Sequence, residues 1–568
     1  MALLAIVVLV TLVSAYAISD AITRITSEVK VGRDKRNLDA MQEAKAALIA
    51  WSASQAWTTG STDQPGSLPC PDTNNDGLAD LTGNACTSQV GRLPWKTIKS
   101  QDFRDASGEI LWYALSANFR NYSGVTVVNS DVQGQLTLYS DQTSTTTPTL
   151  SNVIAILLAP GTTVSGQARA PTDSVALNNV ANYLEGRNAG VTGNYTDTPQ
   201  SPAIYPDSFN DRLLPITHSD LFSVVEPAVA ARIERDIKPY LTSYYTQWTR
   251  FPFPSLFATA GNPAGSPGNP GTSGTGTTRA QSAFLGGTTA TTGGLLPVTN
   301  ATASWNASGT TITLTGGTAA SISGISCSTF TTAAIQYLRC DFNINPVFTT
   351  SCPISGGSTW CMYNPSFRVD GPIPNAGLSF VDLPDFVSTP VTVTNASGLT
   401  TRAMTSTSQT NSLAATGVGT ISFAGTHTRS STSSAARAMR VTIPGVTISA
   451  LTNSNDANAG WFISNEWYRQ LYYAVSPGYL PGGSGSCTPL PATPSCLTVN
   501  SLPTSYAQTT DKRAILVLGG RSLNGTSRPS SSPGNYFEAE NTTPADYIFA
   551  HSSGNATSTN DRVIVVAP

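Results

Sequence analysis

The segment that decides the fold is LWYALS at residues 111–116, because it returns as LYYAVS at residues 471–476. Four further pairs of blocks follow these segments in the same order and at similar spacing. They are LTL at 136–138 with LTV at 497–499, AILL at 155–158 with AILV at 514–517, YLE at 183–185 with YFE at 536–538, and NDR at 210–212 with NDR at 560–562. Internal similarity of this kind indicates one structural unit used more than once. The sequence therefore predicts two tandem copies of one lobe.

A predicted helix precedes these blocks in each copy. The first helix ends near Ser54, and the second is expected to start at a capping box of Ser223 and Glu226, with Pro227 in its first turn. Both helices are followed by a proline-rich turn and a Leu-Pro pair, at 68–71 and Leu93-Pro94 in the first copy and at 251–254 and Leu296-Pro297 in the second. The repeated unit thus includes a helix.

The repeated blocks are short apolar runs that lie between clusters of Gly, Pro, Asn and Ser. Such runs are typical of strands in an antiparallel sheet. A helix packed on one face of that sheet buries the apolar surface of both elements. We therefore expect an α+β fold, with a helix on an antiparallel sheet in each lobe.

The second copy differs from the first by a large insertion. Residues 259–280 are rich in Gly and Pro and read as a linker, and residues 301–450 contain alternating Thr-rich runs at 311–315, 391–394 and 440–443 that predict an all-β sandwich module. Trp305, Trp360 and Tyr363 in this module are candidates for contact with a surface glycan or protein ligand, although core packing is the expected role of Trp360. The expected order is a helix at 1–54, a first lobe at 55–222, the start of the second lobe at 223–300, the module at 301–450 and the rest of the second lobe at 451–568.

The composition is that of an exported, β-rich surface protein. Only 11% of the 568 residues are charged and the net charge is −3, so no basic field is present to bind nucleic acid. Motifs for a nucleophile elbow, a phosphate-binding loop or a zinc protease are absent from the sequence, and we expect a protein that is not an enzyme. Glu185 and Glu538 recur in the two copies and are expected to pair with Arg212 or Arg562. An exported hydrolase that uses paired carboxylates remains a further alternative.

The eight cysteines form four close sequential pairs, which indicates local disulfides made in an oxidising compartment. Free or metal-bound thiols are the alternative, although the chain has no C-x-x-C motif. The pairs are Cys70 with Cys86, Cys327 with Cys340, Cys352 with Cys361, and Cys487 with Cys496.

The N-terminal segment predicts one long helix. Residues 1–19 carry no charged side chain and could cross most of a bilayer as a helix, and the first proline of the chain is Pro65. A cleaved signal peptide is the alternative, because Ala15-Tyr16-Ala17 fits a cleavage site, but no basic segment precedes the apolar run. Beyond Asp20 the helix is expected to be amphipathic, with apolar residues at Ile22, Ile25 and Val29 and then at Leu38, Met41, Ala44, Leu48 and Trp51.

This segment resembles the N-terminal helix of type IV pilins and of the pseudopilins of type II secretion. The resemblance implies that Met1 follows a removed basic leader, and that the helix lies in the inner membrane before assembly and in the filament core afterwards. The chain departs from the family at Ala5, where most members have Glu, and this departure is typical of the large minor pseudopilin at the filament tip. The filament-core residues that the resemblance implies are Leu3, Leu4, Ile6, Val7, Leu9, Leu12, Ile18, Ile22 and Ile25.

The expected function is that of a structural subunit in an extracellular type IV filament or pseudopilus at the bacterial cell surface. Its partners would be other copies of itself or other pilin-like subunits, with the surface lobes available for adhesion. The alternative is a non-polymerising surface binding protein held by a plain signal-anchor helix. A short basic leader encoded upstream of Met1 would favour the first hypothesis over the second.

A calcium site is predicted in the loop DTNNDGLAD at residues 72–80. Calcium prefers six to eight oxygen ligands, and the oxygen-bearing residues Asp72, Asn74, Asp76 and Asp80 alternate along this loop, with the carbonyl of Leu78 as a further ligand. Gly83 stands where an EF-hand has Glu, so the loop is more similar to the Asp-rich loops of dockerin and thrombospondin repeats. An Asx-rich turn that binds no metal is the alternative.

Overall fold

The structure is a computed structural model of the chain. In the strands between Asn306 and Ile448 it describes the backbone pairing and few of the side chains. It describes all residues except 1, 56–63, 84, 121–126, 143–145, 170–173, 191, 197–208, 253, 255–291, 297–305, 316–318, 333–334, 346–353, 356–357, 371–377, 383–387, 396–401, 405–408, 412–417, 430–436, 449–450, 452–455, 481–483, 491–494, 507–508, 524, 526–527, 529–531, 544–545 and 553–557.

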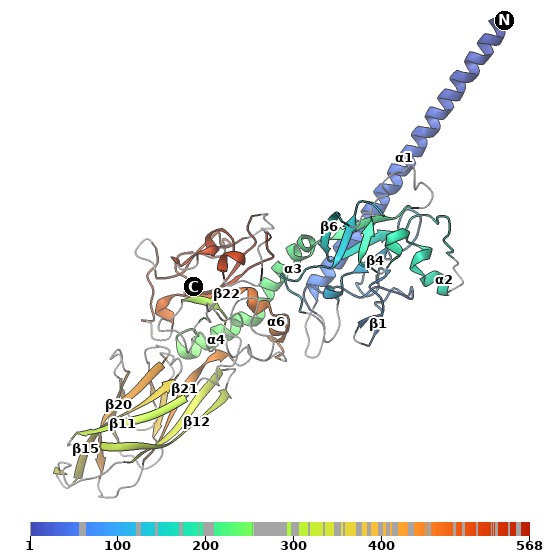
Figure 1. The fold of residues 1–568 in the computed structure, drawn as a ribbon. Coiled ribbons are helices and arrows are strands. Elements are labelled where there is room, and N and C mark those ends of the chain that lie inside the picture. Colours follow the sequence, from blue (N-terminus) through green and yellow to red (C-terminus); the bar gives the residue numbers. More distant parts are fainter. Residues whose placement is uncertain are drawn as a thin grey trace. The chain divides into compact units, whose positions relative to one another are not determined.

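The chain divides into two compact units, Met1–Ala228 and Val229–Pro568. Both contain helices and antiparallel sheets, which confirms the expected α+β class (Figure 1). The predicted linker at 259–280 and the side chains of Trp305, Trp360 and Tyr363 lie outside the described residues.

The first unit is built on helix α1 (Ala2–Ser54) and a four-stranded antiparallel sheet. In spatial order the strands are β3 (Val90–Arg92), β4 (Trp112–Leu115), β7 (Ala155–Ala159) and β9 (Arg212–Ile216). A second sheet joins β6 (Pro148–Val153), β5 (Leu136–Tyr139) and β8 (Asn194–Thr196), with β5 and β8 parallel. The shorter elements are β1 (Leu81–Thr82), β2 (Ala85–Cys86), η1 (Ala117–Phe119), α2 (Ser174–Asn178), η2 (Val180–Asn182) and η3 (Gly186–Ala189).

Both faces of this four-stranded sheet are covered, which explains why its central strands read as continuous apolar runs. Trp112, Ala114, Ile156 and Leu158 belong to one core cluster, on the face away from α1. The strands β7 and β9 contact α1, and Met41, Ala44, Leu48 and Ile49 of the helix are buried. The second half of α1 is therefore part of the core.

The buried stripe of α1 differs from the expected one at Leu38, whose side chain is 43% exposed. The neighbouring Asn37 is buried instead, and its Oδ1 accepts a hydrogen bond from the backbone N–H of Ala106 at 2.6 Å. At this turn of α1 the side chain that faces the lobe is therefore the polar Asn37, and not Leu38 as the spacing of apolar residues predicted.

The helix that opens the second copy starts earlier than expected. α3 (His218–Arg232) directly follows β9, so Pro227 lies inside the helix and the capping box predicted at Ser223 and Glu226 is wrong. The hydroxyl of Thr217 accepts a hydrogen bond from Asp220 N at 3.2 Å, and Asp220 Oδ2 accepts one from Thr217 N at 2.8 Å. These reciprocal bonds satisfy N–H groups at the true start of the helix.

A π-helical turn interrupts this helix. α3 runs into η4 (Ile233–Ile237) and then into α4 (Lys238–Trp248), with Pro239 in the first turn of α4. Proline lacks the N–H that would continue the α-helical bonding pattern, so a wider turn just before it accommodates the ring.

The second unit contains a four-stranded antiparallel sheet with the same spatial order as the first. Its strands are β10 (Gly293–Leu295), β22 (Leu471–Val475), β24 (Ala514–Leu518) and β26 (Arg562–Ala567), and β26 contacts α4. Here β23 (Thr498–Asn500) and β25 (Ile548–Ala550) pair in parallel, as β5 and β8 do. The shorter elements are α6 (Gly460–Ser464), η8 (Trp467–Gln470), η9 (Pro477–Tyr479), η10 (Pro533–Asn535) and η11 (Ala539–Thr542).

The registers of the two sheets correspond along the first two strand pairs, whereas the pairing of β24 with β26 has a shift between Ala514 and Ile515. Arg92 is paired with Trp112, and the corresponding Leu295 is paired with Tyr472. Ala114 lies opposite Ile156, as Ala474 lies opposite Ile515. The blocks at 111–116 and 155–158 therefore occupy the same places in the first sheet as those at 471–476 and 514–517 do in the second.

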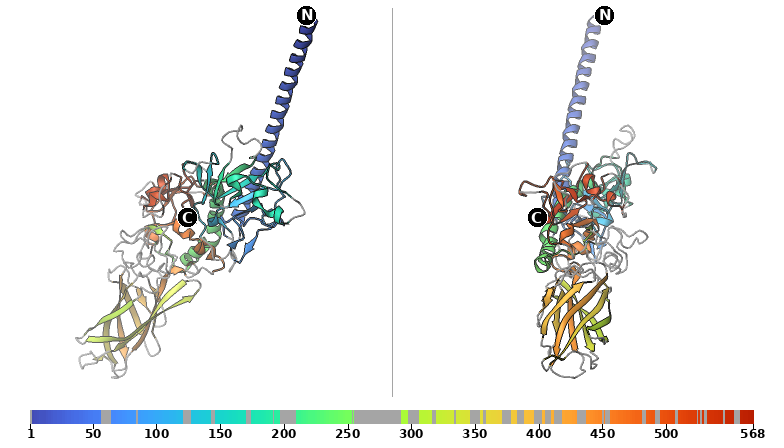
Figure 2. Two further views of the ribbon diagram at one scale, coloured as in Figure 1. Left: turned by 45° about the vertical axis from the view of Figure 1, so that its right-hand side comes forward. Right: turned by 90° about the vertical axis from the view of Figure 1, so that its left-hand side faces the viewer.

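Between β10 and β22 the described residues form strands only, up to Ile448. These are β11 (Asn306–Thr315), β12 (Ala319–Thr332), β13 (Ile335–Asn345), β14 (Ile354–Ser355), β15 (Ser358–Asp370), β16 (Leu378–Asp382), β17 (Ser388–Asn395), β18 (Arg402–Met404), β19 (Gln409–Asn411), β20 (Val418–Arg429) and β21 (Arg437–Ile448). All their pairings are antiparallel, and the long strands run side by side (Figure 2). This β module is encoded between two neighbouring strands of the second sheet.

Two of the predicted disulfides are confirmed. Cys70 is bonded to Cys86 with a Cα–Cα distance of 5.3 Å, and Cys487 is bonded to Cys496 with a Cα–Cα distance of 4.9 Å. Cys327 and Cys340 are directly opposed in the pairing of β12 with β13. The side chains of Cys327, Cys340 and Cys361 and the whole of Cys352 lie outside the described residues.

A membrane span was expected at residues 1–19. Among the residues that the structure describes, no helix has the length and apolar character needed to cross a membrane.

The packing of α1 predicts a contrast between two leucines of the same helix. Leu48→Ala removes a fully buried side chain and is expected to lower the free energy of unfolding of the first unit by about 2–5 kcal/mol. Leu38→Ala changes an exposed side chain and is expected to stay within about 0.5 kcal/mol of the parent. Urea denaturation of the full chain measures both, and equal losses would contradict the described orientation of α1.

The difference between Arg92 and Leu295 gives a second prediction. Arg92 is buried, its guanidinium lies 4.9 Å from the ring centres of Trp112 and Tyr183, and it donates a hydrogen bond to Asn178 Oδ1 at 3.1 Å. Because the second lobe has leucine here, Arg92→Leu is expected to leave the free energy of unfolding unchanged or raise it. Arg92→Ala, which leaves a cavity, is expected to lower it by about 2 kcal/mol or more. A loss in Arg92→Leu as large as that in Arg92→Ala would show that the charge itself is required.

Candidate functional site

The first candidate site is the exposed apolar surface of α1. Large apolar side chains between Ile6 and Ile18 are exposed by 50% (Val8) to 76% (Tyr16). Figure 1 shows this part of α1 extending beyond the sheet on which its second half packs. Of the predicted filament-core residues, the structure places Ile6, Val7, Leu9, Leu12 and Ile18 on this surface, and the side chains of Leu3, Leu4, Ile22 and Ile25 lie outside the described residues.

Charged side chains follow this apolar surface along α1. Asp20 forms an ion pair with Arg24 at 3.0 Å, one helical turn away. Further along, Asp34 Oδ1 lies 3.4 Å from Arg212 Nε of β9, and Lys45 Nζ lies 2.7 Å from Asp220 Oδ2. The polar contacts of α1 with its own lobe therefore begin at Asp34, beyond the exposed apolar side chains. We call Ala2–Arg33 the stem.

The second candidate site is the loop at 72–80. Asp72 is buried and its carboxylate accepts hydrogen bonds from the N–H groups of Asn74, Asn75 and Gly77 at 3.1, 2.7 and 2.7 Å. Burial raises the pKa of Asp72, although these three bonds act in the opposite direction. Gly77 has φ +83°, and an added Cβ would lie 2.8 Å from the Trp95 ring, so glycine is required at this turn.

Oxygen atoms of Asp80 and Asp76 also accept hydrogen bonds from within the loop, whereas the buried Asn75 Oδ1 has no hydrogen-bond partner. Asp80 Oδ2 accepts bonds from the N–H and the hydroxyl of Thr73, both at 2.7 Å, and Asp80 Oδ1 accepts one from Asn74 Nδ2 at 3.1 Å. Asp76 Oδ1 accepts one from Leu78 N at 2.7 Å. Over the described part of the chain, no three or more His, Cys, Asp or Glu side chains are grouped to hold a metal ion. Hydrogen bonds within the loop therefore stabilise the conformation that the structure describes.

The third candidate is a hydrogen-bond network around Glu185, for which the sequence pointed to the glutamate but not to its partner. Glu185 does not pair with Arg212, which contacts Asp34 instead, so that expectation is wrong. Glu185 Oε2 accepts hydrogen bonds from the N–H groups of Asn210 and Asp211 at 2.9 and 3.1 Å. In return Asp211 Oδ2 accepts bonds from Glu185 N at 2.9 Å and Asn188 Nδ2 at 3.0 Å. The partner of the recurring glutamate is therefore the aspartate of the NDR block.

The same contacts recur in the second lobe. Asp561 Oδ2 accepts bonds from Glu538 N at 2.8 Å and from Asn541 Nδ2 at 2.9 Å. Glu538 Oε2 accepts one from Asn560 N at 3.1 Å. We call Glu185 with Asp211, and Glu538 with Asp561, the Glu–Asp pairs. An asparagine three residues after each glutamate was the sequence signal that could have revealed both networks.

An arginine supports each network from one side. Arg169 donates to Gly161 O at 2.8 Å and lies 4.9 Å from the ring centre of Tyr183. Arg528 donates to Gly520 O at 2.7 Å and lies 4.7 Å from the ring centre of Tyr536. Equivalent residues thus make equivalent contacts in both lobes.

The pKa values of both Glu–Asp pairs depart from the ordinary range. Burial, together with the charge of Glu185, raises the pKa of Asp211 well above its usual value, and burial together with Glu538 does the same to Asp561. Burial also raises the pKa values of Glu185 and Glu538, against hydrogen bonds that lower them. Two carboxyl groups in contact away from water resist simultaneous ionisation.

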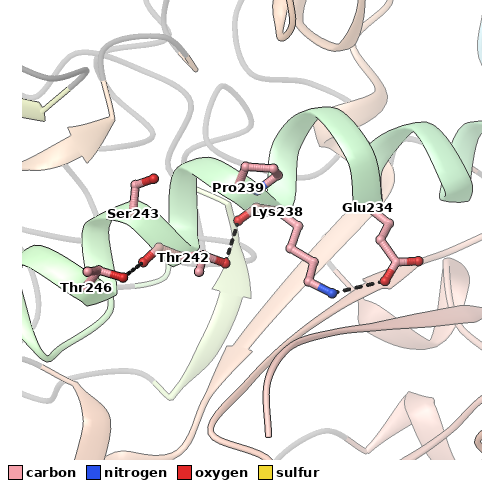
Figure 3. Close-up of a pocket in the computed structure, with 6 residues that line it drawn as sticks. All are labelled: Glu234, Lys238, Pro239, Thr242, Ser243 and Thr246. Carbon is pink, nitrogen blue, oxygen red and sulfur yellow. Dashed lines mark hydrogen bonds and ion pairs between the residues drawn. The ribbon is translucent and has the colours of Figure 1, made fainter. Parts of the chain in front are cut away.

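A surface cavity of about 490 Å³ lies along η4 and α4 (Figure 3). Lys238 Nζ lies 3.0 Å from Glu234 Oε1, and the hydroxyls of Thr242 and Thr246 donate to carbonyls of their own helix at 3.2 and 2.9 Å. These polar groups are already bonded within one helix, so we assign no ligand to this cavity. Its lining residues are Glu234, Lys238, Pro239, Thr242, Ser243 and Thr246.

Comparison with known proteins adds no relative to this description. No family model matches the chain, and no curated protein matches it.

Proposed function

We propose that the chain is a structural subunit of an extracellular type IV filament or pseudopilus, assembled through α1. The observation that carries the proposal is the stem, a helix whose apolar side chains are exposed from Ile6 to Ile18. Contiguous apolar surface of this kind on one element marks a site of association. The lobes would lie outward and bind partners or surfaces.

The energetics favour assembly of stems with one another. Full burial of a Val, Leu or Ile side chain contributes roughly 1.5–3 kcal/mol, so covering half of each exposed side chain contributes about 1 kcal/mol per residue. The stem presents Ile6, Val7, Leu9, Leu12 and Ile18 among other residues of this kind. Several such side chains together outweigh the cost of association only when neighbours surround the helix, as in a bundle of stems.

The two halves of α1 would have different roles in such a subunit. The half beyond Asp34 is fixed to its own lobe by buried apolar side chains and by the contact of Lys45 with Asp220. The stem, in contrast, stays available for neighbours. Ala5 and the large size of the chain favour a minor or tip position, as they do in the pseudopilins that the sequence resembles.

A charge placed on the stem tests this proposal. Leu9→Arg puts a cation where neighbouring stems would pack, and we expect the chain to disappear from filaments in sheared cell-surface fractions viewed by electron microscopy with antibody labelling. The lobes should keep the melting temperature of the parent, because Leu9 is 64% exposed.

Ser107→Arg is the matched control, since it adds the same charge at an exposed turn of the first unit. This variant is expected to enter filaments like the parent. If the parent chain itself is absent from filaments and remains with the cells, the filament proposal is wrong and the non-polymerising surface protein is the better account.

We also propose that the loop at 72–80 binds calcium. The spacing of Asp72, Asn74, Asp76, Leu78 and Asp80 supports this, and so does the Cys70–Cys86 disulfide that closes the loop. Calcium would have to displace the hydrogen bond from Asn74 to Asp80, because both residues are proposed ligands. Binding should therefore be weak enough to follow by titration.

Calcium binding predicts a shift in stability of the full chain. Calcium at a hundred times its dissociation constant would stabilise the first unit by about 2.7 kcal/mol, and a chelator would remove this gain. Asp76→Ala removes a proposed ligand and is expected to abolish the response, whereas Asp39→Ala, at an exposed position of α1, should leave it intact. If the melting temperature of the parent is the same in calcium and in chelator, the loop is an Asx-rich turn without metal.

A further inference from the structure

Each Glu–Asp pair contains one carboxylate oxygen without a donor. Asp211 Oδ2 accepts two hydrogen bonds, but Asp211 Oδ1 is buried and has no hydrogen-bond partner. Asp561 shows the same division, with two bonds to Oδ2 and a buried Oδ1 without a partner. A buried carboxylate oxygen in this state is costly, and one such atom in each of two lobes is not a local accident.

Glu185, in contrast, accepts several donors, and Glu538 accepts one from Asn560 N. Glu185 Oε1 accepts a bond from Gln167 Nε2 at 2.6 Å, in addition to the two backbone bonds to its Oε2. Backbone bonds make the two carboxyl groups of each pair neighbours: Glu185 N donates to Asp211 Oδ2 and Asp211 N donates to Glu185 Oε2, and Glu538 N donates to Asp561 Oδ2. The charge of each glutamate acts on its aspartate. The donors around the glutamate therefore favour its ionised form. The aspartate has an oxygen that no donor contacts, and a proton on this oxygen could form a hydrogen bond to the glutamate.

We propose that each lobe binds one structural proton, held between the aspartate and the glutamate of its Glu–Asp pair at neutral pH. The proton resides on the aspartate oxygen that has no other partner and is donated to the glutamate carboxylate. The pair then carries one negative charge in place of two, and every oxygen in it has a partner. This inference does not depend on the filament proposal.

The charged groups around the first pair support this balance. Arg169 donates to Gln167 Oε1 at 2.7 Å, so it acts on Glu185 through the glutamine. Arg212, next to Asp211 in the chain, contacts Asp34, and Arg187 donates to Gln142 O at 2.8 Å. These cations are engaged with other groups, which leaves the proton as the means of relieving the repulsion between the two carboxyls.

In the second lobe the cations lie on the side of the glutamate. Arg528 and Arg521 act electrostatically on Glu538 and favour its ionised form. His551 binds Val563 through Nδ1 at 3.1 Å, and burial lowers its pKa, so it adds little charge near neutral pH. The distribution of charge again assigns the negative charge to the glutamate and the proton to Asp561.

In each lobe the aspartate that would carry the proton is linked through an asparagine to a neighbouring strand. In the first lobe Asn188 contacts both Asp211, just before β9, and Thr196 of β8, whose N–H donates to Asn188 Oδ1 at 2.8 Å. In the second, Asn541 contacts Asp561 before β26 and accepts a bond from Ala550 N of β25 at 2.8 Å. Loss of the proton would place two charges at this junction and loosen it.

The sign of the pH dependence follows directly. Both members of each pair have raised pKa values in the folded lobe, so the folded state binds a proton that the unfolded chain releases above about pH 4. Stability is therefore highest in mild acid and falls as the pH rises. Each pair is expected to increase the unfolding constant of its lobe by about tenfold per pH unit until the pair itself ionises.

Amide variants test the proposal in the full chain. Asp211→Asn and Asp561→Asn keep the accepting oxygen and provide an N–H donor where the proton would be, and each should flatten the pH dependence of urea unfolding in its own lobe. Glu540→Gln, two residues after Glu538 in η11, is the control and should leave the pH dependence unchanged. Equal pH slopes in the parent and in the double amide variant would overturn the proposal.

Infrared spectroscopy of the unaltered chain gives an answer that does not depend on how the variants fold. A protonated carboxyl has a C=O stretch separate from that of ionised carboxylates, and we expect this band at neutral pH, where ordinary carboxyls are ionised. The band should be about half as strong in each single variant and absent from the double variant. A parent spectrum without the band at pH 7 would show that both pairs are fully ionised.

Discussion

The first unit depends on the burial of one half of a helix against a sheet that is already covered on its other face. Met41, Ala44 and Leu48 of α1 are buried, and the sheet they cover also carries the core cluster around Trp112. One polar contact extends this arrangement. Asp220 both pairs with Lys45 of α1 and caps α3 through Thr217. Although burial opposes it, the hydrogen bonds from Lys45 and Thr217 lower the pKa of Asp220, so the group stays charged near neutral pH. The start of α3 is thereby tied to the helix that opens the chain.

The two lobes keep their polar network and vary their apolar interior. The aspartates of the Glu–Asp pairs accept equivalent bonds in both lobes, and the pairings of β4 with β7 and of β22 with β24 have the same register. In the core, by contrast, Arg92 and Trp112 of the first lobe correspond to Leu295 and Tyr472 of the second. Apolar packing tolerates exchange of volume and shape, whereas a network of buried donors and acceptors fails when one member is missing. The polar residues therefore define the lobe more strictly than the apolar ones.

Local patterns in the sequence predicted the helices and strands more accurately than they predicted the contacts between these elements. The end of α1 at Ser54, the repeated strands and two disulfides follow from apolar runs, breakers and cysteine spacing. The true start of α3 was missed because Thr217 and Asp220 satisfy the capping pattern with an aspartate in place of glutamate. Leu38 was misplaced because Asn37 makes a contact across the lobe that spacing along a helix does not reveal. The predicted partner of Glu185 was wrong for a related reason, since two acids are expected to avoid each other and the spacing of residues along the chain does not reveal the backbone bonds that join Glu185 and Asp211.

The place of the β module in the chain has an evolutionary consequence. β10 and β22 are neighbours in one antiparallel sheet, and Leu295 lies directly opposite Tyr472. Opposed residues in such a pair are about 4.5–5.5 Å apart, a distance that a tight hairpin turn also spans. The segment between these strands, which holds the module and then α6 and η8 of the lobe, therefore returns to the sheet close to where it leaves it. Modules of different sequence and size could be exchanged at this point by recombination, while the lobe beneath keeps its sheet, its helix and its network unchanged.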